Sequence, residues 1–222
     1  MNKIVSVAID GPAAAGKSTV SKEVARRLGY TYIDTGAMYR AVTFYAIDHG
    51  VDPKNEEEVK KLIPDIHIDL NPDGTVMCSG KDVTKVIRTP LVSGSVSYIA
   101  AMVSVRLFLV DQQRAMADSK SVVMDGRDIG TYVLPNADVK VFQIASVKTR
   151  AERRYAENQE KGIPCTYEEI EQDVINRDRI DSGRAFAPLK KADDAVELDT
   201  SNLTIEESIQ AVLDIIAKKV GK

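Results

Sequence analysis

The feature that most constrains this chain is a glycine-rich stretch near its start, between an apolar run and a helical pattern. Residues 11–18 read GPAAAGKS, with the spacing G-x-x-x-x-G-K-[ST]. The apolar run is residues 4–9 and the helical pattern is residues 18–28. A strand, a glycine loop and a helix in this order predict a phosphate-binding loop. An accidental glycine turn is the alternative, and composition alone produces one in roughly one chain in a hundred of this length.

The chemistry of such a loop follows from its backbone. Glycine lets successive N–H groups turn inward around an anion, and the helix that follows adds partial positive charge at its N-terminus. Lys17 then reaches the outer phosphates, and the Ser18 hydroxyl is placed to ligate Mg²⁺. The sequence therefore predicts a nucleoside triphosphate site that includes a magnesium ligand.

The composition sets the size of the fold and excludes some partners. The 222 residues suffice for one substantial domain with insertions, so we expect a single domain over residues 1–222. A net charge of −3 argues against nucleic-acid binding, and no apolar stretch has the length of a membrane span. Cys78 and Cys165 match no metal spacing, and we expect them to be reduced in a cytoplasmic, monomeric protein.

Short apolar runs alternate with helical patterns along the chain. This alternation predicts an α/β fold, with a parallel β-sheet core flanked by helices as in P-loop NTPases. One strand ends at Asp125, which either lies beside the phosphate loop and its metal or caps the following turn. The expected strands are residues 4–9, 30–34, 121–125, 139–145 and 195–198.

One segment that departs from this alternation lies in the first half of the chain. In residues 64–84, apolar and polar residues alternate on both sides of Pro72-Asp73-Gly74. Proline, aspartate and glycine favour a tight turn between two strands. We therefore expect a hairpin here and a small antiparallel sheet.

A second such segment, residues 147–181, reads as two highly charged helices broken at Gly162. Thr166 and Glu169 have the spacing of a capping box, which starts the second helix. A charged, interrupted helical hairpin is typical of a mobile lid and equally of a solvated surface. The phosphate loop favours the lid.

Several arginines follow expected strands, where a parallel sheet binds its ligands. Arg40 closes the segment DTGAMYR, residues 34–40, and Arg127 lies in GRDIGT, residues 126–131. A guanidinium at either place suits phosphate oxygens. The alternatives are that the first segment is only a helix cap and that Arg127 pairs with the adjacent Asp128.

A further set, Arg177, Asp181 and Arg184, has the spacing i, i+4, i+7 and shares one helix face if the helix persists past Gly183. A solvated row of ion pairs has the same spacing, and Arg153 with Glu157 would form an ordinary i,i+4 pair. The arginines together exceed the needs of one triphosphate. Phosphoryl transfer to a phosphate acceptor would use them all, because its transition state spreads charge over equatorial oxygens and its nucleophile needs no general base.

These motifs occur in one order: residues 11–18, 34–40 and 126–131, then Arg177, Asp181 and Arg184, then Ala-Pro-Leu at 187–189. In this combination the chain closely resembles the bacterial-type cytidylate kinase family over essentially its whole length. The resemblance implies transfer of the γ-phosphoryl of ATP, with Mg²⁺, to CMP or dCMP. It also implies an acceptor-binding insertion over residues 35–100, which includes the hairpin, and a lid over residues 147–181.

The resemblance further implies roles for single residues. Those that read the cytosine are Thr35, Ser97, Arg106 and Asp128. Those that clamp the acceptor phosphate are Tyr39, Arg40, Arg127 and Arg184. Those on the sugar side are Arg177 and Asp181. Position 35 is Thr where some members have Ser, which keeps the hydroxyl but adds a methyl group near the base.

The donor side is assigned in the same way. The ATP-binding residues are Gly11, Pro12, Ala13, Ala14, Ala15, Gly16, Lys17, Ser18, Thr19 and Arg153. The residues assigned to the transfer step are Lys17, Arg127, Arg184 and Arg154, with Ser18 as the Mg²⁺ ligand, partly through water. Arg150 belongs to the same lid arginines.

Two other classes of function compete with this one. A different small-molecule or nucleotide kinase has the same phosphate loop, and only the acceptor-side residues separate the two. A nucleotide-dependent switch of the GTPase type needs an N/T-K-x-D motif, and Thr84-Lys85-Val86-Ile87 lacks the aspartate. Turnover that requires an added monophosphate distinguishes a kinase from a switch.

Overall fold

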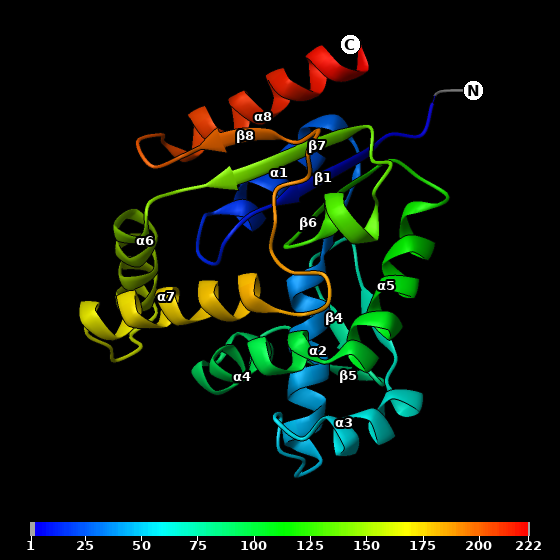
Figure 1. Ribbon diagram of the computed structural model, residues 1–222, viewed down its shortest axis with the longest axis vertical. Helices are drawn as coiled ribbons and strands as arrows, with labels where there is room; N and C mark the ends of the chain where they lie inside the picture. Colours follow the sequence, from blue (N-terminus) through cyan, green and yellow to red (C-terminus); the bar gives the residue numbers. More distant parts are fainter. Residues whose placement is uncertain (1–2, 222) are drawn as a thin grey trace. The chain divides into compact units, whose positions relative to one another are not determined.

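The computed structural model describes residues 3–221, which form two compact units (Figure 1). The second unit is Ile33–Ser119, and the first consists of the remaining described residues on either side of it in the sequence. Each unit has a hydrophobic core of its own.

A five-stranded sheet with the order β2-β6-β1-β7-β8 organises the first unit, and the chain passes into the second unit within β2. β1 pairs in parallel with β6 and β7, and β7 pairs in parallel with β8. The strands are β1 (Ser6–Asp10), β2 (Thr31–Asp34), β6 (Val122–Gly126), β7 (Val139–Ile144) and β8 (Val196–Asp199). All five confirm the expected strands to within two residues at each end.

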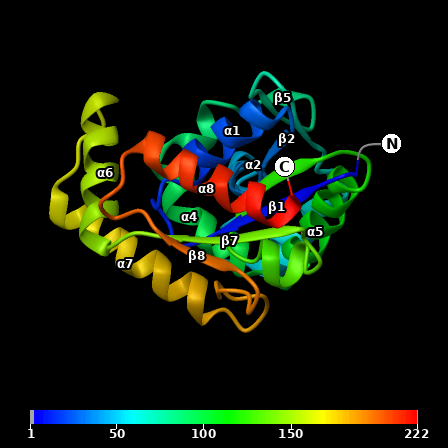
Figure 2. The ribbon, with the colours of Figure 1, turned by 90° about the horizontal axis from the view of Figure 1, so that it is seen from above.

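Helices α1 (Lys17–Leu28) and α8 (Ile205–Val220) cover this sheet (Figure 2). Their apolar side chains, with Val24 and Val212 fully buried, pack into one core with those of β1 and β7. β1 is buried along nearly its whole length, as is typical of a central parallel strand. The sheet thus holds the end of β1 and the start of α1 in fixed positions.

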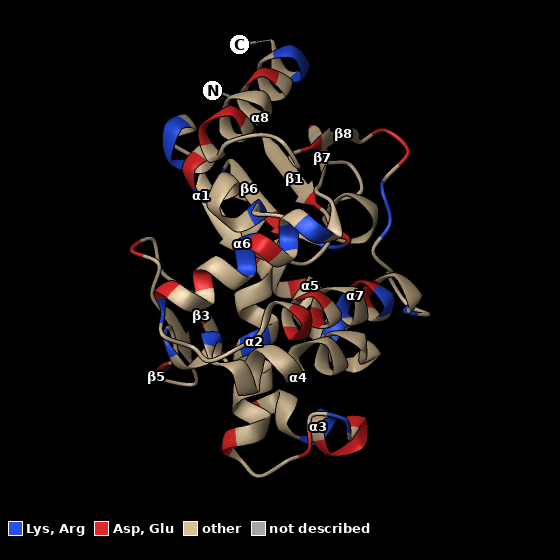
Figure 3. Cartoon of the chain, turned by 90° about the vertical axis from the view of Figure 1, so that its left-hand side faces the viewer, with Lys and Arg blue, Asp and Glu red and all other residues tan. Residues whose placement is uncertain are grey.

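The charged hairpin is present as α6 (Val147–Glu160) and α7 (Tyr167–Gly183), which pack against each other. Gly162 has φ 65°, a conformation that suits the residue after a helix end, and the capping box of Thr166 and Glu169 is formed. Acidic and basic side chains are interspersed along both helices (Figure 3). The predicted helix pair, its break and its cap are confirmed.

The second unit is mainly helical, with α2 (Thr35–Asp48) packed on α4 (Pro90–Ala101) and also contacting α5 (Val103–Ala117). Short turns of 3₁₀ helix at Ile63–Asp65 and Val86–Arg88 link these elements to the rest. Its other elements are α3 (Glu56–Leu62), β3 (Ile68–Leu70), β4 (Val76–Cys78) and β5 (Lys81–Asp82).

The predicted hairpin is confirmed as β3 and β4, which pair in antiparallel register around the turn. β5 adds a third strand that the sequence did not indicate. Val105 and Leu109 of α5 are buried in the core of this unit, which spans Ile33–Ser119. Among the described residues no single helix is long and apolar enough to cross a membrane. The helices α4 and α5, which are bent sharply against each other, reach the required length and apolar composition only when they are taken together.

Candidate active site

Two glycines with positive φ shape the loop between β1 and α1. Gly11 has φ 151°, and a Cβ there would lie 1.9 Å from the backbone oxygen of Gln143 on β7, so only glycine fits. Gly16 has φ 83° at the N-cap of α1, a left-handed conformation that glycine adopts without strain. The loop therefore passes close over β7 and delivers its last residues to a helix N-terminus, where amide groups attract anions.

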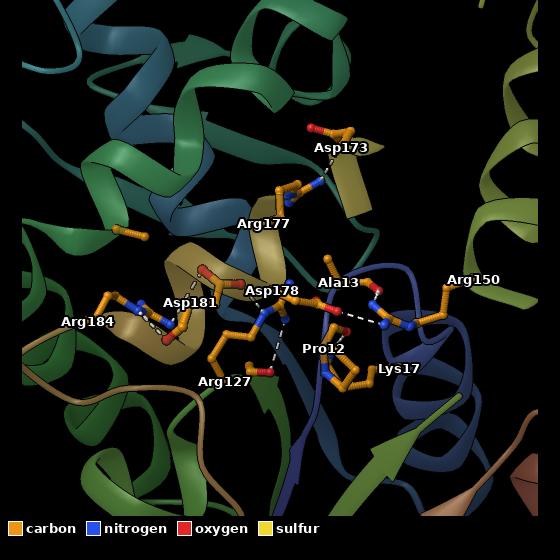
Figure 4. A network of polar contacts seen from close by, with 12 residues as sticks. Pro12, Ala13, Lys17, Arg127, Arg150, Asp173, Arg177, Asp178, Asp181 and Arg184 are labelled. Carbon is orange, nitrogen blue, oxygen red and sulfur yellow. Dashed lines mark hydrogen bonds and ion pairs between the residues drawn. The ribbon is translucent and has the colours of Figure 1, made fainter. Parts of the chain in front are cut away.

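Three side chains hold the carbonyl groups of this loop. Lys17 Nζ donates to the carbonyl of Pro12 at 2.8 Å, and Gln143 Nε2 donates to that of Ala15 at 2.7 Å. Arg150 donates to the carbonyl of Ala13 at 3.0 Å (Figure 4). These three bonds hold the carbonyl groups of the loop in fixed positions.

Burial perturbs two charged groups beside the loop. It lowers the pKa of Lys17 to about 7, with the nearby Arg127 acting in the same direction. It also raises the pKa of Asp10 to about 7, against two hydrogen bonds that the carboxylate accepts from the backbone N–H groups of Ile129 (2.8 Å) and Gly130 (2.7 Å). An anion beside Lys17 would favour its charged form.

The Ser18 hydroxyl and the Asp125 carboxylate lie together at the start of α1 and the end of β6. Ser18 Oγ donates to Asp125 Oδ2 at 2.8 Å, and Tyr32 donates to the other carboxylate oxygen at 2.9 Å. Hard oxygen ligands such as these suit Mg²⁺, which commonly takes one or two protein oxygens together with substrate phosphates. Of the two interpretations of Asp125, its contact with the loop favours the metal side. No group of three metal-binding side chains occurs among residues 3–221.

A buried cluster of charges lies at the end of α7 and after β6 (Figure 4). Arg127 Nε donates to Asp181 at 2.9 Å, so its ion pair is with a residue 54 positions later. Arg184 Nε donates to the backbone oxygen of Asp181 at 3.1 Å. Although burial acts to raise the pKa of Asp181, Arg127 and the other arginines hold it below its ordinary value.

Arg177, one turn before Asp181 on α7, is a partly buried cation whose ion pair with Asp173 is long, at 3.9 Å. Burial, and then repulsion from Arg127, lower its pKa. The cluster therefore holds more positive charge than the carboxylates in close contact with it can neutralise. A phosphate group would complete it.

The lid arginines have separate partners. Arg153 donates to the carbonyl of Thr200 at 2.6 Å. Of the ordinary i,i+4 pairs considered as an alternative role for this group, Glu157 with Lys161 is present, whereas Arg153 does not pair with Glu157, which contacts Arg154 instead. The guanidinium of Arg153 turns away because backbone oxygens after β8 are within its reach.

The candidate cytosine and phosphate residues of the second unit are also buried. Arg40 donates to Ser93 Oγ at 2.7 Å, and Arg106, which is fully buried, donates to the carbonyl of Ala100 at 3.0 Å. The Arg106 guanidinium lies 5.4 Å from the centre of the Tyr39 ring, within cation–π range. Thr35 and Ser97 are buried in the same unit. Polar side chains this deeply buried are costly unless they are hydrogen-bonded, and Arg40 and Arg106 both are.

The structure thus groups the predicted residues by unit. The loop, Arg127, Asp128, Arg177, Asp181 and Arg184 belong to the first unit, where the electrostatic influence of Arg127 and Asp181 on Lys17 places them close together. Thr35, Tyr39, Arg40, Ser97 and Arg106 belong to the second. Sequence reasoning missed Asp10, Gln143 and Asp178. Gln143 left a weak signal, because it and Lys140 are the two polar residues of a strand whose other residues are apolar.

A phosphate loop on a parallel sheet, with a buried arginine cluster beside its lysine, defines the class of P-loop kinases. The fold agrees: a gluconokinase from Sinorhizobium meliloti 1021 matches with a TM-score of 0.51 at 14% identity, over 96% of this chain and 92% of that one. The family model described as cytidylate kinase matches residues 7–218. The chain belongs to the cytidylate kinase family.

Two curated relatives agree with this assignment. A cytidylate kinase from Anoxybacillus flavithermus (strain DSM 21510 / WK1) is 50% identical, covering 99% of both chains. A cytidylate kinase from Bacillus cereus (strain ATCC 10987 / NRS 248) is 50% identical over 100% of both. The sequence resemblance to this family is therefore confirmed.

Proposed function

We propose that the protein transfers the γ-phosphoryl group of ATP to CMP or dCMP and releases ADP with CDP or dCDP. An oxygen of the acceptor phosphate attacks the γ-phosphorus, and the bond from that phosphorus to the β,γ-bridging oxygen breaks. The observation that carries this proposal is the family match over residues 7–218 in a chain whose phosphate loop lies beside a buried arginine cluster.

On the donor side, the loop backbone from Gly11 to Gly16 holds the ATP phosphates, and Lys17 reaches the outer ones. Ser18, with Asp125 beside it, would hold Mg²⁺, which supplies charge neutralisation to the β- and γ-phosphates when bound. The glycine conformations of the loop and the helix N-terminus that follows it support this assignment. A bound phosphate would also favour the charged form of Lys17, whose pKa burial lowers to about 7.

On the acceptor side, the residues that we assign to the monophosphate are Arg127, Arg184, Tyr39 and Arg40. Thr35, Ser97, Arg106 and Asp128 read the cytosine, Arg177 and Asp181 contact the sugar, and Arg153 and Arg154 act on the ATP side. A carboxylate and hydroxyls accept hydrogen bonds from the exocyclic amine, and an arginine donates to the ring acceptors. The buried, polar character of these side chains supports the proposal.

Charge explains why such a site accelerates transfer. The acceptor phosphate is already an anion, so it needs no general base, and the guanidinium groups offset the repulsion between it and the triphosphate. We also propose that α6 and α7 close as a lid that excludes water, and that the protein acts as a cytoplasmic monomer on small-molecule substrates. Light scattering during turnover tests the oligomeric state.

A panel of acceptors tests the function. ADP release is measured with ATP, Mg²⁺ and each of CMP, dCMP, UMP, AMP, GMP and dTMP, and we expect CMP and dCMP to be turned over fastest. No turnover on CMP, with good turnover on another monophosphate, would mean a different kinase. ATP hydrolysis at the same rate without any acceptor would mean a nucleotide switch.

Asp128→Ala tests the reading of the base. We expect the KM for CMP to rise about 5- to 150-fold, because leaving a buried polar group without its partner costs about 1–3 kcal/mol, while ATP affinity stays within twofold. Asp214→Asn, which removes an exposed carboxylate on α8, is the control and should change neither. Equal losses of ATP and CMP affinity in Asp128→Ala would contradict the assigned role.

A further inference from the structure

Arg150 differs from the other lid arginines because it touches the phosphate loop directly. Its side chain is 4% exposed and makes three hydrogen bonds in three directions. Nε donates to the carbonyl of Ala145 at the end of β7 (2.9 Å), and one terminal nitrogen donates to the carbonyl of Ala13 in the loop (3.0 Å). The other terminal nitrogen donates to Asp178 on α7 at 2.6 Å.

Asp178 is the link from this arginine to the rest of α7 (Figure 4). It follows Arg177 directly and precedes Asp181 by three residues, so a displacement of Asp178 moves both. Its Oδ1 is buried and makes no hydrogen bond within the described part of the chain, so the bond to Arg150 is the principal anchor of the carboxylate.

We propose that Arg150 is a positioning residue that couples the phosphate loop to α7, through one guanidinium that binds Ala13 and Asp178 at the same time. Occupation of the loop by ATP fixes Ala13, and through Arg150 it fixes Asp178 with its neighbours Arg177 and Asp181. The pairing therefore makes the binding of donor and acceptor favour each other. This inference rests on the proposed function, in which α7 contacts the acceptor.

Position 150 requires an arginine because three acceptors lie around its side chain in different directions. A guanidinium has five N–H donors in a rigid plane and can satisfy a strand end, a loop and a carboxylate together. A lysine ammonium keeps the charge but cannot keep all three directions. Arg153 and Arg154, one turn along α6, contact Thr200 and Glu157 respectively, so they do not duplicate the link.

The consequences of breaking each end differ. In Asp178→Asn the loop keeps its bond to Arg150, so ATP affinity measured alone stays within about twofold of wild type. The link to α7 is weakened, so the factor by which acceptor increases ATP affinity falls towards one. In Arg150→Lys both bonds are lost, so ATP affinity alone falls about tenfold and the coupling factor falls as well.

The experiment measures the dissociation constant of a non-hydrolysable ATP analogue by calorimetry, with and without saturating acceptor. The acceptor is CMP, or the monophosphate that wild type phosphorylates fastest. Proteins are wild type, Asp178→Asn, Arg150→Lys, the double variant and Glu152→Gln. Glu152 pairs at 4.0 Å with Lys148, and both are exposed on α6, so the control removes a charge without touching the loop.

We expect a coupling factor of at least fivefold in wild type and Glu152→Gln, and less than twofold in the other three. The double variant should lose no more coupling than Arg150→Lys alone, because both changes break one link. A purely structural role would lower the unfolding temperature and leave the coupling factor unchanged. Should Arg150→Lys fail to fold, Asp178→Asn decides alone, since it preserves shape.

A wild-type coupling factor near one, or wild-type coupling in Asp178→Asn, would overturn the inference. The inference would also be overturned if the double variant lost as much coupling as the two single variants added together, because Arg150 and Asp178 would then act through independent contacts. Failure of CMP as acceptor contradicts the proposed function only, because the coupling is then measured with the monophosphate that is used.

Discussion

Replacement of Gly11 by alanine is the most direct test of how the loop is held. The added Cβ would lie 1.9 Å from the backbone oxygen of Gln143 and 3.0 Å from its carbon. A carbon–oxygen contact needs about 3.3 Å, so one of the two backbones must retreat by about 1.4 Å. Neither backbone can move freely, because Gly11 directly follows β1, and β1 and β7 are neighbouring strands of one sheet.

The cost follows from two effects. Overpacking in a filled site costs about 1–3 kcal/mol, and a φ of 151° adds about 1–3 kcal/mol of strain for a residue with a side chain. The sum, about 2–6 kcal/mol, is a large part of the roughly 5–15 kcal/mol that stabilises a typical domain. For a chain of this length it corresponds to a fall in Tm of about 5–20 °C.

Thermal unfolding and ATP binding together form the assay. A loop displaced by about 1.4 Å loses phosphate hydrogen bonds worth about 1.5–3 kcal/mol each, so ATP affinity should fall at least tenfold. Gly94→Ala in α4 is the matched control, because no described atom lies within 4 Å of the added Cβ and alanine favours a helix by about 1 kcal/mol. Wild-type Tm and ATP affinity in Gly11→Ala would refute the reasoning.

Two further predictions concern the charges and the metal ligand. Burial raises the pKa of Asp10 from 3.8 to about 7, so the unfolded chain releases this proton before the folded protein does. Asp10 therefore subtracts stability as pH rises from about 4 to 7. Chemical denaturation should therefore show that the free energy of unfolding falls less over this pH range in Asp10→Asn than in wild type. An equal fall in the two proteins would contradict the burial argument. Ser18→Ala should raise the Mg²⁺ concentration for half-maximal activity about tenfold, as expected for about 1.4 kcal/mol. Ser21→Ala on the same helix should leave it unchanged, because the Ser21 hydroxyl has no hydrogen-bond partner among the described residues. An unchanged Mg²⁺ requirement in Ser18→Ala would exclude this ligand.

Local pattern was enough to predict the sheet, the loop and the charged hairpin. The strand before Gly11 and the helix after it have strong periodicity, and Gly162 with the capping box at Thr166 marks the break between α6 and α7. β5 was missed because its two residues, Lys81 and Asp82, are both exposed and carry no apolar signal. The sequence analysis also named no helix at α4 or α5, although both bury apolar side chains in the core of the second unit.

The contacts that complete the site could not be predicted from such local patterns. Arg150 lies 137 positions from Ala13, Gln143 lies 128 positions from Ala15, and Asp10 lies 120 positions from Gly130. No local spacing encodes pairings over that distance, because they follow from the order of strands in the sheet. The same limit applied to Arg127, for which an adjacent carboxylate was considered and Asp181 is the observed partner.

These long-range contacts explain how the protein keeps an anion site ready without an anion. Burial away from water, and then repulsion from Arg127, lower the pKa values of Lys17 and Arg177. Backbone carbonyls and Asp181 offset only part of this repulsion, since hydrogen bonds to neutral groups do not cancel charge. The remaining imbalance is a cost of the ligand-free state that nucleotide phosphates remove. The loop and the arginine cluster are therefore arranged for charge that arrives with the substrates, at some expense to the stability of the protein alone.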